Sequence, residues 1–255
     1  MNAAALLLTG VVFAFSDEQG VRLLATSEVA NPHMLNVALC TGAPRPFAIE
    51  FDRTQAEGQD STGRQNPQNF ERTGGSVFRI IGAKVSSGST CVVTEQAFLA
   101  DATLVTLQRP PDSARCSKAT YPQLQKDKGR PVLGCWPIGE SPAGDRRIAV
   151  LEFSRHLTRA LASIVVRDGD RRIYVDFPAI FTGPGDDLWR ADDGGSIHPE
   201  GFQVVFLMKR GTTYLIGIDW AGAEGSVLSI HVADGPGDSI QFQEVMSDSW
   251  YRSPL

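Results

Sequence analysis

The residue types that could carry chemistry are scattered through this sequence. Its four histidines are His33, His156, His198 and His231, and no two of them have the H-x-H, H-x-x-x-H or H-E-x-x-H spacing of a zinc-binding pair. His198 lies in a loop-like segment, where it would act as a general base only beside a nucleophile. His231 lies on the polar face of an expected strand, so we expect its side chain to be exposed to solvent.

The sequence motifs of common enzyme classes are also missing. Residues 139–143, GESPA, depart from the G-x-S-x-G nucleophile elbow at the last position. The sequence has no phosphate-binding P-loop, and no G-x-G-x-x-G follows an expected strand. We therefore expect no catalytic machinery. The alternative is an extracytoplasmic hydrolase with a site drawn from His156, His198, Asp192 and Asp193.

Carboxylates are most concentrated in residues 186–195, DDLWRADDGG. Carboxylate oxygens on a glycine-rich loop are ligands that calcium prefers. The spacing departs from an EF-hand loop, no glutamate follows at the required offset, and Arg190 offsets part of the charge. We expect a solvated loop and no cofactor. The weak calcium candidates are Asp186, Asp187, Asp192 and Asp193.

Two tryptophans and two arginine doublets are candidates for a binding surface. Trp136 and Trp189 would stack on the face of a sugar or a base if their rings are exposed, and the alternative is packing at the edge of a core. Arg146-Arg147 and Arg171-Arg172 flank expected strands. If those strands pair, the doublets would form a basic patch for an acidic or phosphate-bearing ligand. Solubilising the strand ends is the alternative.

The four cysteines, Cys40, Cys91, Cys116 and Cys135, include no C-x-x-C pair, which argues against a zinc ribbon or a thioredoxin-like site. An even number suits two disulfides in an oxidising compartment. We favour Cys40–Cys91, because each borders a strand-like run, and Cys116–Cys135, because they bracket a stretch rich in Pro and Gly. Four buried thiols in a cytosolic protein are the alternative.

The N-terminal apolar run, residues 3–15, also bears on the compartment. Its length fits the hydrophobic region of a signal peptide and is too short for a membrane span, which needs about 20 residues. Small residues at Ala14 and Ser16 precede Asp17, as signal peptidase requires, although no Lys or Arg precedes the run. We expect residues 1–16 to be a signal peptide of a periplasmic or secreted protein. The alternative is a hairpin of 11–16 and 21–26.

Short strands separated by turn residues dominate the rest of the chain. Asp168-Gly169-Asp170 between the apolar runs 161–167 and 172–177 predicts a hairpin. The runs 202–208, 213–220 and 226–232 predict a C-terminal meander. A short helix is expected over 121–128, with Pro122 in its first turn and Gly129 after it. The pattern is typical of an all-β or β-rich α+β fold, an antiparallel sandwich or barrel, with at most one or two short helices.

The composition excludes several classes of protein and of partner. With 255 residues, a net charge of −5 and 42% hydrophobic residues, the chain fits a globular protein and not a coiled coil or a disordered tail. Its acidic balance argues against a nucleic-acid partner, and no stretch is long enough for a transmembrane helix.

Two polar segments, 52–74 and 109–147, are long for simple connections. The start of the second, Arg109-Pro110-Pro111-Asp112, predicts a boundary between β-rich parts at 17–110 and 111–255, which are also compatible with a single domain. We expect a binding or structural role for an exported protein, with a protein or envelope component as partner. An inhibitor-like module that presents the 52–74 loop is a further alternative.

Overall fold

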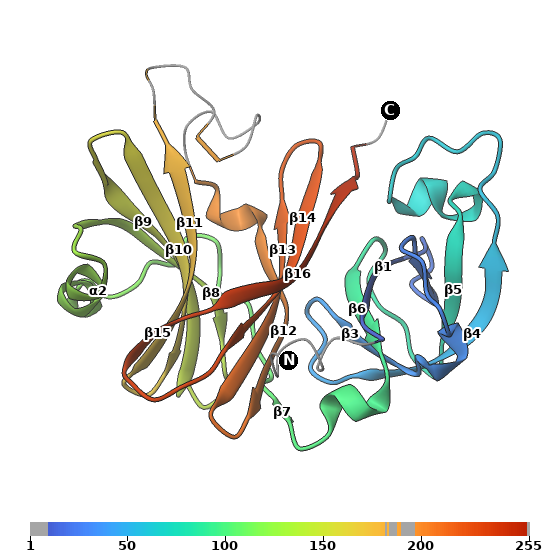
Figure 1. Ribbon diagram of the computed structural model, residues 1–255, viewed down its shortest axis with the longest axis horizontal. Helices are drawn as coiled ribbons and strands as arrows, with labels where there is room; N and C mark the ends of the chain where they lie inside the picture. The colour runs from blue at the N-terminus through green and yellow to red at the C-terminus, as the bar shows by residue number, and fades with distance from the viewer. Residues whose placement is uncertain (1–9, 182, 184–187, 190–196, 254–255) are drawn as a thin grey trace.

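The computed structural model describes residues 10–181, 183, 188–189 and 197–253. They form three β layers: an outer five-stranded sheet, a central five-stranded sheet and a closed six-stranded barrel, which follow one another from left to right in Figure 1. The expected all-β antiparallel fold is confirmed, and the sandwich and the barrel occur together.

The barrel has the strand order β1-β2-β5-β4-β3-β6 and closes through the β1–β6 pair. Val12 and Ala14 of β1 belong to the barrel interior, whereas Phe13 and Phe15 belong to the core that the barrel shares with the central sheet. Both faces of β1 are therefore buried, which explains its continuous apolar run. The strands are β1 (Val12–Ser16), β2 (Arg22–Ala25), β3 (Val37–Cys40), β4 (Phe47–Gln55), β5 (Gly75–Ile80) and β6 (Thr90–Thr94).

β1 occupies residues that the sequence pattern assigned to a signal peptide. The hairpin alternative matches the structure, since β1 and β2 pair through Phe15 and Leu24. The buried Asp17 holds the turn between them, where its carboxylate accepts hydrogen bonds from the backbone N–H groups of Val21 and Arg22. Cleavage after Ser16 would remove β1 and open edges on β2 and β6. A leader boundary at residue 16 would therefore remove one strand of the closed barrel. The signal peptide and export stay predictions.

The outer and central sheets pack face to face over a shared apolar core. The outer sheet has the order β15-β11-β10-β9-β8, and the central sheet has the order β16-β14-β13-β12-β7. The hairpins expected around Gly169 and Gly211, and the meander that continues into β14, are confirmed. The strands are β7 (Thr103–Leu104), β8 (Val132–Glu140), β9 (Arg146–His156), β10 (Arg159–Asp168), β11 (Arg171–Ile180), β12 (Phe202–Arg210), β13 (Thr213–Ala221), β14 (Gly225–Ala233), β15 (Ser239–Gln241) and β16 (Gln243–Tyr251).

The segment from β15 to β16 crosses from one sheet to the other. β15 pairs in parallel with β11 of the outer sheet, and β16 pairs antiparallel with β14 of the central sheet. Figure 1 shows this segment running across the front of both sheets. Phe242 lies between the two strands and is buried in the core of the sandwich. The crossing therefore borders the space between the sheets at one edge.

The barrel packs on the other face of the central sheet. Phe15 of β1 contacts Phe70 and Trp250 edge to face, with ring centroids 5.7 and 5.8 Å apart. β7 precedes the boundary predicted at Arg109, yet it pairs with β12 of the central sheet. A strand of the first predicted part thus belongs to the sheet of the second.

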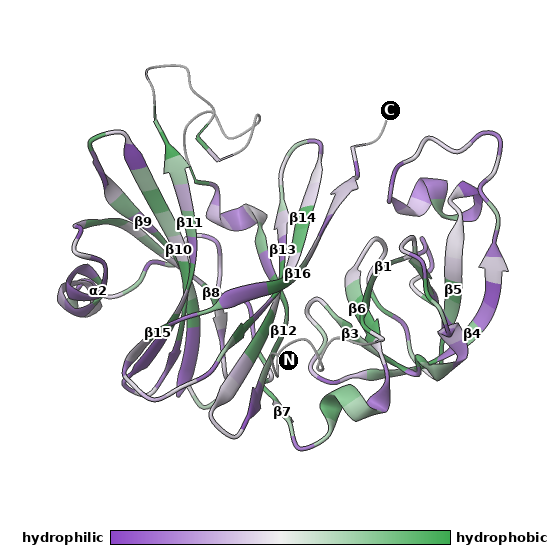
Figure 2. Ribbon diagram, viewed as in Figure 1, coloured by the Kyte–Doolittle hydropathy of each residue, from purple (hydrophilic) through white to green (hydrophobic). Residues whose placement is uncertain are grey.

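The helix α2 (Tyr121–Lys128) covers part of the outer sheet and has the predicted bounds. Gly129 ends it in the left-handed region, with φ of 63°, whereas Thr120 makes no side-chain cap. Leu124 is buried toward the sheet, and Asp127 accepts hydrogen bonds from Arg172 Nε and Tyr174 Oη at 2.6 and 2.7 Å. The rest of the helix is hydrophilic (Figure 2).

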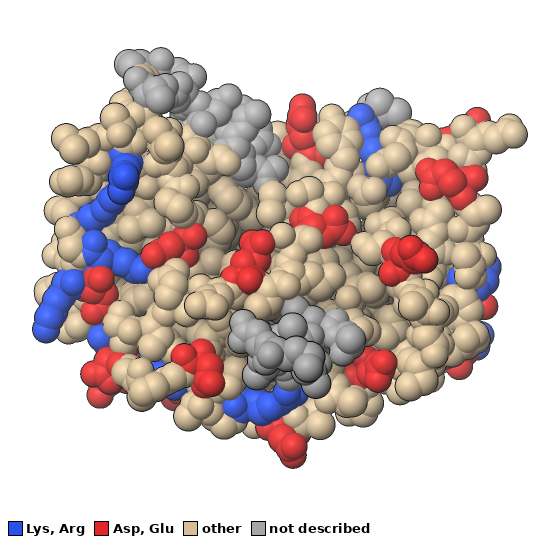
Figure 3. All heavy atoms as spheres, in the orientation of Figure 1, with Lys and Arg blue, Asp and Glu red and all other residues tan. Residues whose placement is uncertain are grey.

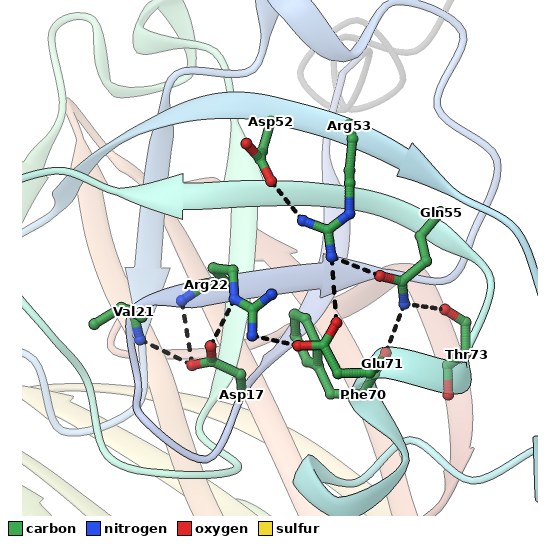
Figure 4. A network of polar contacts seen from close by, with 9 residues as sticks. All are labelled: Asp17, Val21, Arg22, Asp52, Arg53, Gln55, Phe70, Glu71 and Thr73. Carbon is green, nitrogen blue, oxygen red and sulfur yellow. Dashed lines mark hydrogen bonds and ion pairs between the residues drawn. The ribbon is translucent and has the colours of Figure 1, made fainter.

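The long polar segment 52–74 is packed onto the barrel. It ends in the 3-10 turn η2 (Pro67–Arg72), whose Phe70 is buried. Glu71 of this turn pairs with Arg22 and Arg53, and Gln55 Nε2 donates to the carbonyl of Phe70 at 2.6 Å (Figure 4). The other 3-10 turns are η1 (Pro32–Met34), η3 (Gln96–Leu99), η4 (Lys118–Thr120) and η5 (Pro199–Gly201).

Both expected disulfides are confirmed with the favoured pairing. Cys40 and Cys91 lie opposite each other on the neighbouring strands β3 and β6 of the barrel. Cys116 and Cys135 join the segment before α2 to β8. Such bonds fit a protein of an extracellular or periplasmic compartment. Within the described ranges, no helix has the length and apolar character to cross a membrane.

Candidate functional site

A pocket of about 260 Å³ lies between the outer and central sheets, beside the β15–β16 crossing. Three aromatic side chains from different elements line it: Phe177 of β11, Trp220 of β13 and Phe242 at the crossing. Ser229, His231 and Glu244 add polar groups. Glu244 is exposed, whereas Ser229 and His231 are buried, so the pocket runs from solvent to a polar inner end.

The alternation of β14 explains why polar groups lie inside the sandwich. Leu228 and Ile230 belong to the core that faces the barrel. Ser229 and His231 alternate with them and therefore face the outer sheet. The expectation that His231 is exposed was wrong, since only 5% of it is accessible. The polar face of β14 is covered by a second sheet, which no pattern within β14 could indicate.

Ser229 and His231 form a buried polar pair. The Nε2 atom of His231 lies 2.8 Å from Ser229 Oγ, within hydrogen-bond distance. Burial lowers the pKa of His231 to about 4, and the charge of Glu244, opposite on β16, offsets this shift only in part. The imidazole is therefore neutral at pH 7 and offers one donor and one acceptor nitrogen.

The aromatic wall is held by contacts among rings. Phe177 and Trp220 meet edge to face, with centroids 5.2 Å apart, and Trp220 stacks on Phe202 at 4.9 Å. Trp189, a predicted binding platform, supports this wall: its Nε1 donates to the backbone carbonyl of Phe177 at 2.8 Å. Its ring is partly buried against the sandwich core. Trp189 thus lies near the pocket but is not among its lining residues.

Trp136, the other predicted platform, lies on β8 away from this pocket. Its ring packs partly buried against the sandwich core and covers Gly134, where a Cβ atom would come within 1.9 Å of the ring. Gly134 therefore allows the close approach of the indole. The guanidinium of Arg115 lies 5.7 Å from the ring centroid. These contacts match the core-edge alternative for Trp136.

Of the residues named for a hydrolase, the structure describes His156 and His198, and Asp192 and Asp193 lie outside the described residues. His156 is exposed at the end of β9, and His198 has its Nδ1 atom 3.5 Å from Glu200 Oε1 on the surface. Neither lines the pocket of Ser229 and His231. Among the described residues, no group of three or more His, Cys, Asp or Glu side chains is placed to hold a metal ion. The calcium candidates Asp186, Asp187, Asp192 and Asp193 lie outside the described residues.

The lowered pKa of His231 predicts a specific pH dependence of stability. The folded value of about 4 lies below the unperturbed 6.5, so the fold favours the neutral form. This contribution is present above pH 6.5 and is lost as the pH falls toward 4, by about 3 kcal/mol in total. Between pH 7 and pH 4, we expect the free energy of unfolding of His231→Asn to fall by about 3 kcal/mol less than that of the parent. Urea unfolding at both pH values measures the difference. Equal pH dependence in both proteins would contradict this, and the exposed His156→Asn is the control.

Comparisons with known proteins found no matching family model, no similar curated protein and no similar solved structure.

Proposed function

We propose that this is an exported, non-catalytic binding protein that takes a small ring-shaped ligand in the pocket between its sheets. The observation that carries the proposal is the buried Ser229–His231 pair among three aromatic walls. The interior of a sandwich is ordinarily filled by apolar side chains, because a buried polar group costs free energy unless it is hydrogen-bonded. Here polar groups face a cavity, as in sites that orient a ligand.

The lining indicates the class of ligand. Aromatic faces such as that of Trp220 stack on sugar and heterocycle rings. The neutral imidazole of His231 and the hydroxyl of Ser229 suit ligand hydroxyl or N–H groups. Among the described lining residues are two carboxylates, Asp176 and Glu244, and no Lys or Arg, although Lys128 pairs with Asp176 at 2.7 Å. We therefore expect an uncharged, hydroxyl-bearing ring such as a sugar, and not an anion.

The disulfides support the proposed compartment. Two of them in one chain fit an oxidising environment, so we propose a periplasmic or secreted protein. A role in an envelope or extracellular assembly, with a protein or envelope component as partner, belongs to the same proposal. The inhibitor-like alternative has less support, since the segment 52–74 is tied to the barrel by Phe70 and Glu71.

Intrinsic fluorescence tests the proposal, because Trp220 lines the pocket. The protein is titrated with a panel of neutral monosaccharides and disaccharides, aromatic heterocycles and sugar acids. We expect a saturable change with at least one neutral ring compound, which Trp220→Phe abolishes and the control Trp136→Phe retains. His231→Ala should weaken the same binding by about tenfold, since it removes a buried hydrogen-bond partner. The proposal would be overturned if no compound of the panel gave a saturable response, or if Trp220→Phe left the response unchanged.

A hydrolase is the second candidate function, and the Ser229–His231 contact favours it. The geometry suits proton transfer from a serine hydroxyl to an imidazole. Two features weigh against it: a base with a pKa of about 4 is weak, and no carboxylate of the described chain hydrogen-bonds to His231. Reaction with a fluorophosphonate probe decides between the two. Labelling that Ser229→Ala abolishes would establish the hydrolase and overturn the non-catalytic proposal.

A further inference from the structure

Three arginines form a row across the face of the outer sheet that also carries α2. Arg147 of β9, Arg167 of β10 and Arg172 of β11 are partners in the strand register, with Arg167 in the middle. Directly opposite residues of antiparallel strands point to the same face, and like charges in this arrangement destabilise a sheet. The basic patch was expected on the condition that the strands carrying the two doublets pair. These strands, β9 and β11, do not pair with each other: they lie on either side of β10, which contributes the third arginine.

The two outer arginines of the row have carboxylate partners. Arg147 Nε lies 2.8 Å from Glu140 Oε1, and Arg172 Nε lies 2.6 Å from Asp127 Oδ2. The side chain of Arg167 makes no hydrogen bond or ion pair with any residue that the structure describes, although its backbone belongs to the ladder of β9, β10 and β11. One positive charge in the middle of the row is thus left without a counter-charge from this part of the chain. A half-buried guanidinium in this position favours an external anion.

Arg167 also lines a cavity. About 260 Å³ of space lies between the outer sheet and the segment that precedes α2, which the Cys116–Cys135 disulfide holds to β8. The helix has only eight residues and covers part of this sheet face. The apolar lining of the cavity includes Leu124 of α2 and, from the sheet, Ala149 and Val165.

The charges around the cavity are mostly positive. Its lining contains Arg115, Arg147 and Arg167, against a single carboxylate, Glu140, which Arg147 already engages. The guanidinium of Arg115 donates to the backbone carbonyls of Asp112 and Ala114 and to no described carboxylate. Figure 3 shows Lys and Arg side chains, with Asp and Glu side chains among them, along the left edge of the molecule.

We propose that this cavity binds an anionic amphiphile: a monocarboxylate with a short aliphatic body, whose carboxylate pairs with Arg167. The apolar floor and the disulfide would contact the aliphatic body, which gains free energy from leaving water. Arg167 offers the fork of N–H donors that matches a carboxylate. The site goes beyond the function proposed above and is separate from that pocket, since none of its lining residues is shared.

Calorimetric titration of the intact protein with sodium octanoate tests this site. We expect saturable binding that is at least about tenfold weaker for acetate, which lacks the apolar body, and for 1-octanol, which lacks the charge. Arg167→Gln should weaken octanoate binding by about tenfold or more, and Arg167→Lys by less, because it keeps the charge. The control Arg159→Gln, at the exposed far end of β10, should bind octanoate as the parent does.

The outcomes separate this site from the pocket between the sheets. Trp220→Phe should leave octanoate binding unchanged, so failure of one proposal does not decide the other. Near-ultraviolet circular dichroism checks that Arg167→Gln retains the native fold, and Arg167→Lys supplies the comparison if it does not. Octanoate binding that survives Arg167→Gln unchanged would overturn the proposal. So would acetate or octanol binding as tightly as octanoate, or no octanoate binding at all.

Discussion

Replacing Phe15 with alanine is expected to lower the free energy of unfolding by about 4 kcal/mol. The side chain is fully buried, in the core between the barrel and the central sheet. Its ring meets those of Phe70 and Trp250 edge to face, so truncation leaves a cavity that both partners line. Urea unfolding, followed by tryptophan fluorescence, measures the loss. Phe47→Ala, at a half-buried position on β4, is the control and should cost clearly less.

The same substitution tests whether the mature protein contains β1. If the chain is cut after Ser16, the mature protein lacks Phe15, and Phe15→Ala leaves its stability unchanged. If β1 is retained, the protein isolated from its native host shows the full loss. Intact mass spectrometry of the same sample, with and without reductant, reports where the mature chain begins and whether both disulfides are present.

Removal of the barrel disulfide is expected to cost about 4 kcal/mol in the chain-entropy account. Cys40 and Cys91 are separated by 51 residues, both are buried, and they cross-link neighbouring strands. Without the bond, the unfolded chain regains the freedom of that long loop. The double variant Cys40→Ala/Cys91→Ala, compared with the parent in urea, measures the effect.

The second disulfide provides a matched comparison. Cys116 and Cys135 are separated by 19 residues, so the same reasoning gives a smaller loss of about 3 kcal/mol for Cys116→Ala/Cys135→Ala. The order of the two variants is the informative result. A larger loss for the second pair would show that the native packing around each bond, and not loop length, sets its contribution.

Elements with strong local signals could be predicted from the sequence. The hairpin of β10 and β11 follows from the Asp-Gly turn at Gly169 between two apolar runs, and Gly211 marks the next one. The bounds of α2 follow from Pro122 and Gly129. The disulfide pairing followed from the strand-like runs that Cys40 and Cys91 border and from the stretch rich in Pro and Gly that Cys116 and Cys135 bracket. The turn and helix signals depend on residues close to one another in the chain, whereas Cys40 and Cys91 are 51 residues apart.

Other elements lack such a signal. β4 and β16 carry many polar residues because they are largely exposed, and β8 contains Gly134 and Pro137 at bulges in its pairing with β9. The parallel pairing of β15 with β11 joins segments distant in the chain. Neither barrel closure nor the crossing between sheets leaves a local pattern, so a sandwich and a barrel remained alternatives.

The candidate site, too, could be predicted from the sequence only in part. The alternation of Ser229 and His231 with apolar residues was readable, but the covering of their face by the outer sheet was not. A polar face on a strand indicates solvent only where no second sheet lies over it. The sequence did not single out Arg167, because the row of three arginines forms only when β10 pairs with the strands that carry Arg147 and Arg172.

The contact of Trp250 with Phe13 and Phe15 joins the first strand of the barrel to the last strand of the central sheet, with ring centroids 6.4 and 5.8 Å apart. Protein synthesis at about 5–20 residues per second needs tens of seconds to reach the last strand of a chain of this size. For all of that time β1 lacks the partner that completes the core between the barrel and the central sheet. A ribosome-bound chain therefore cannot complete the core between the barrel and the central sheet until β16 has been synthesised.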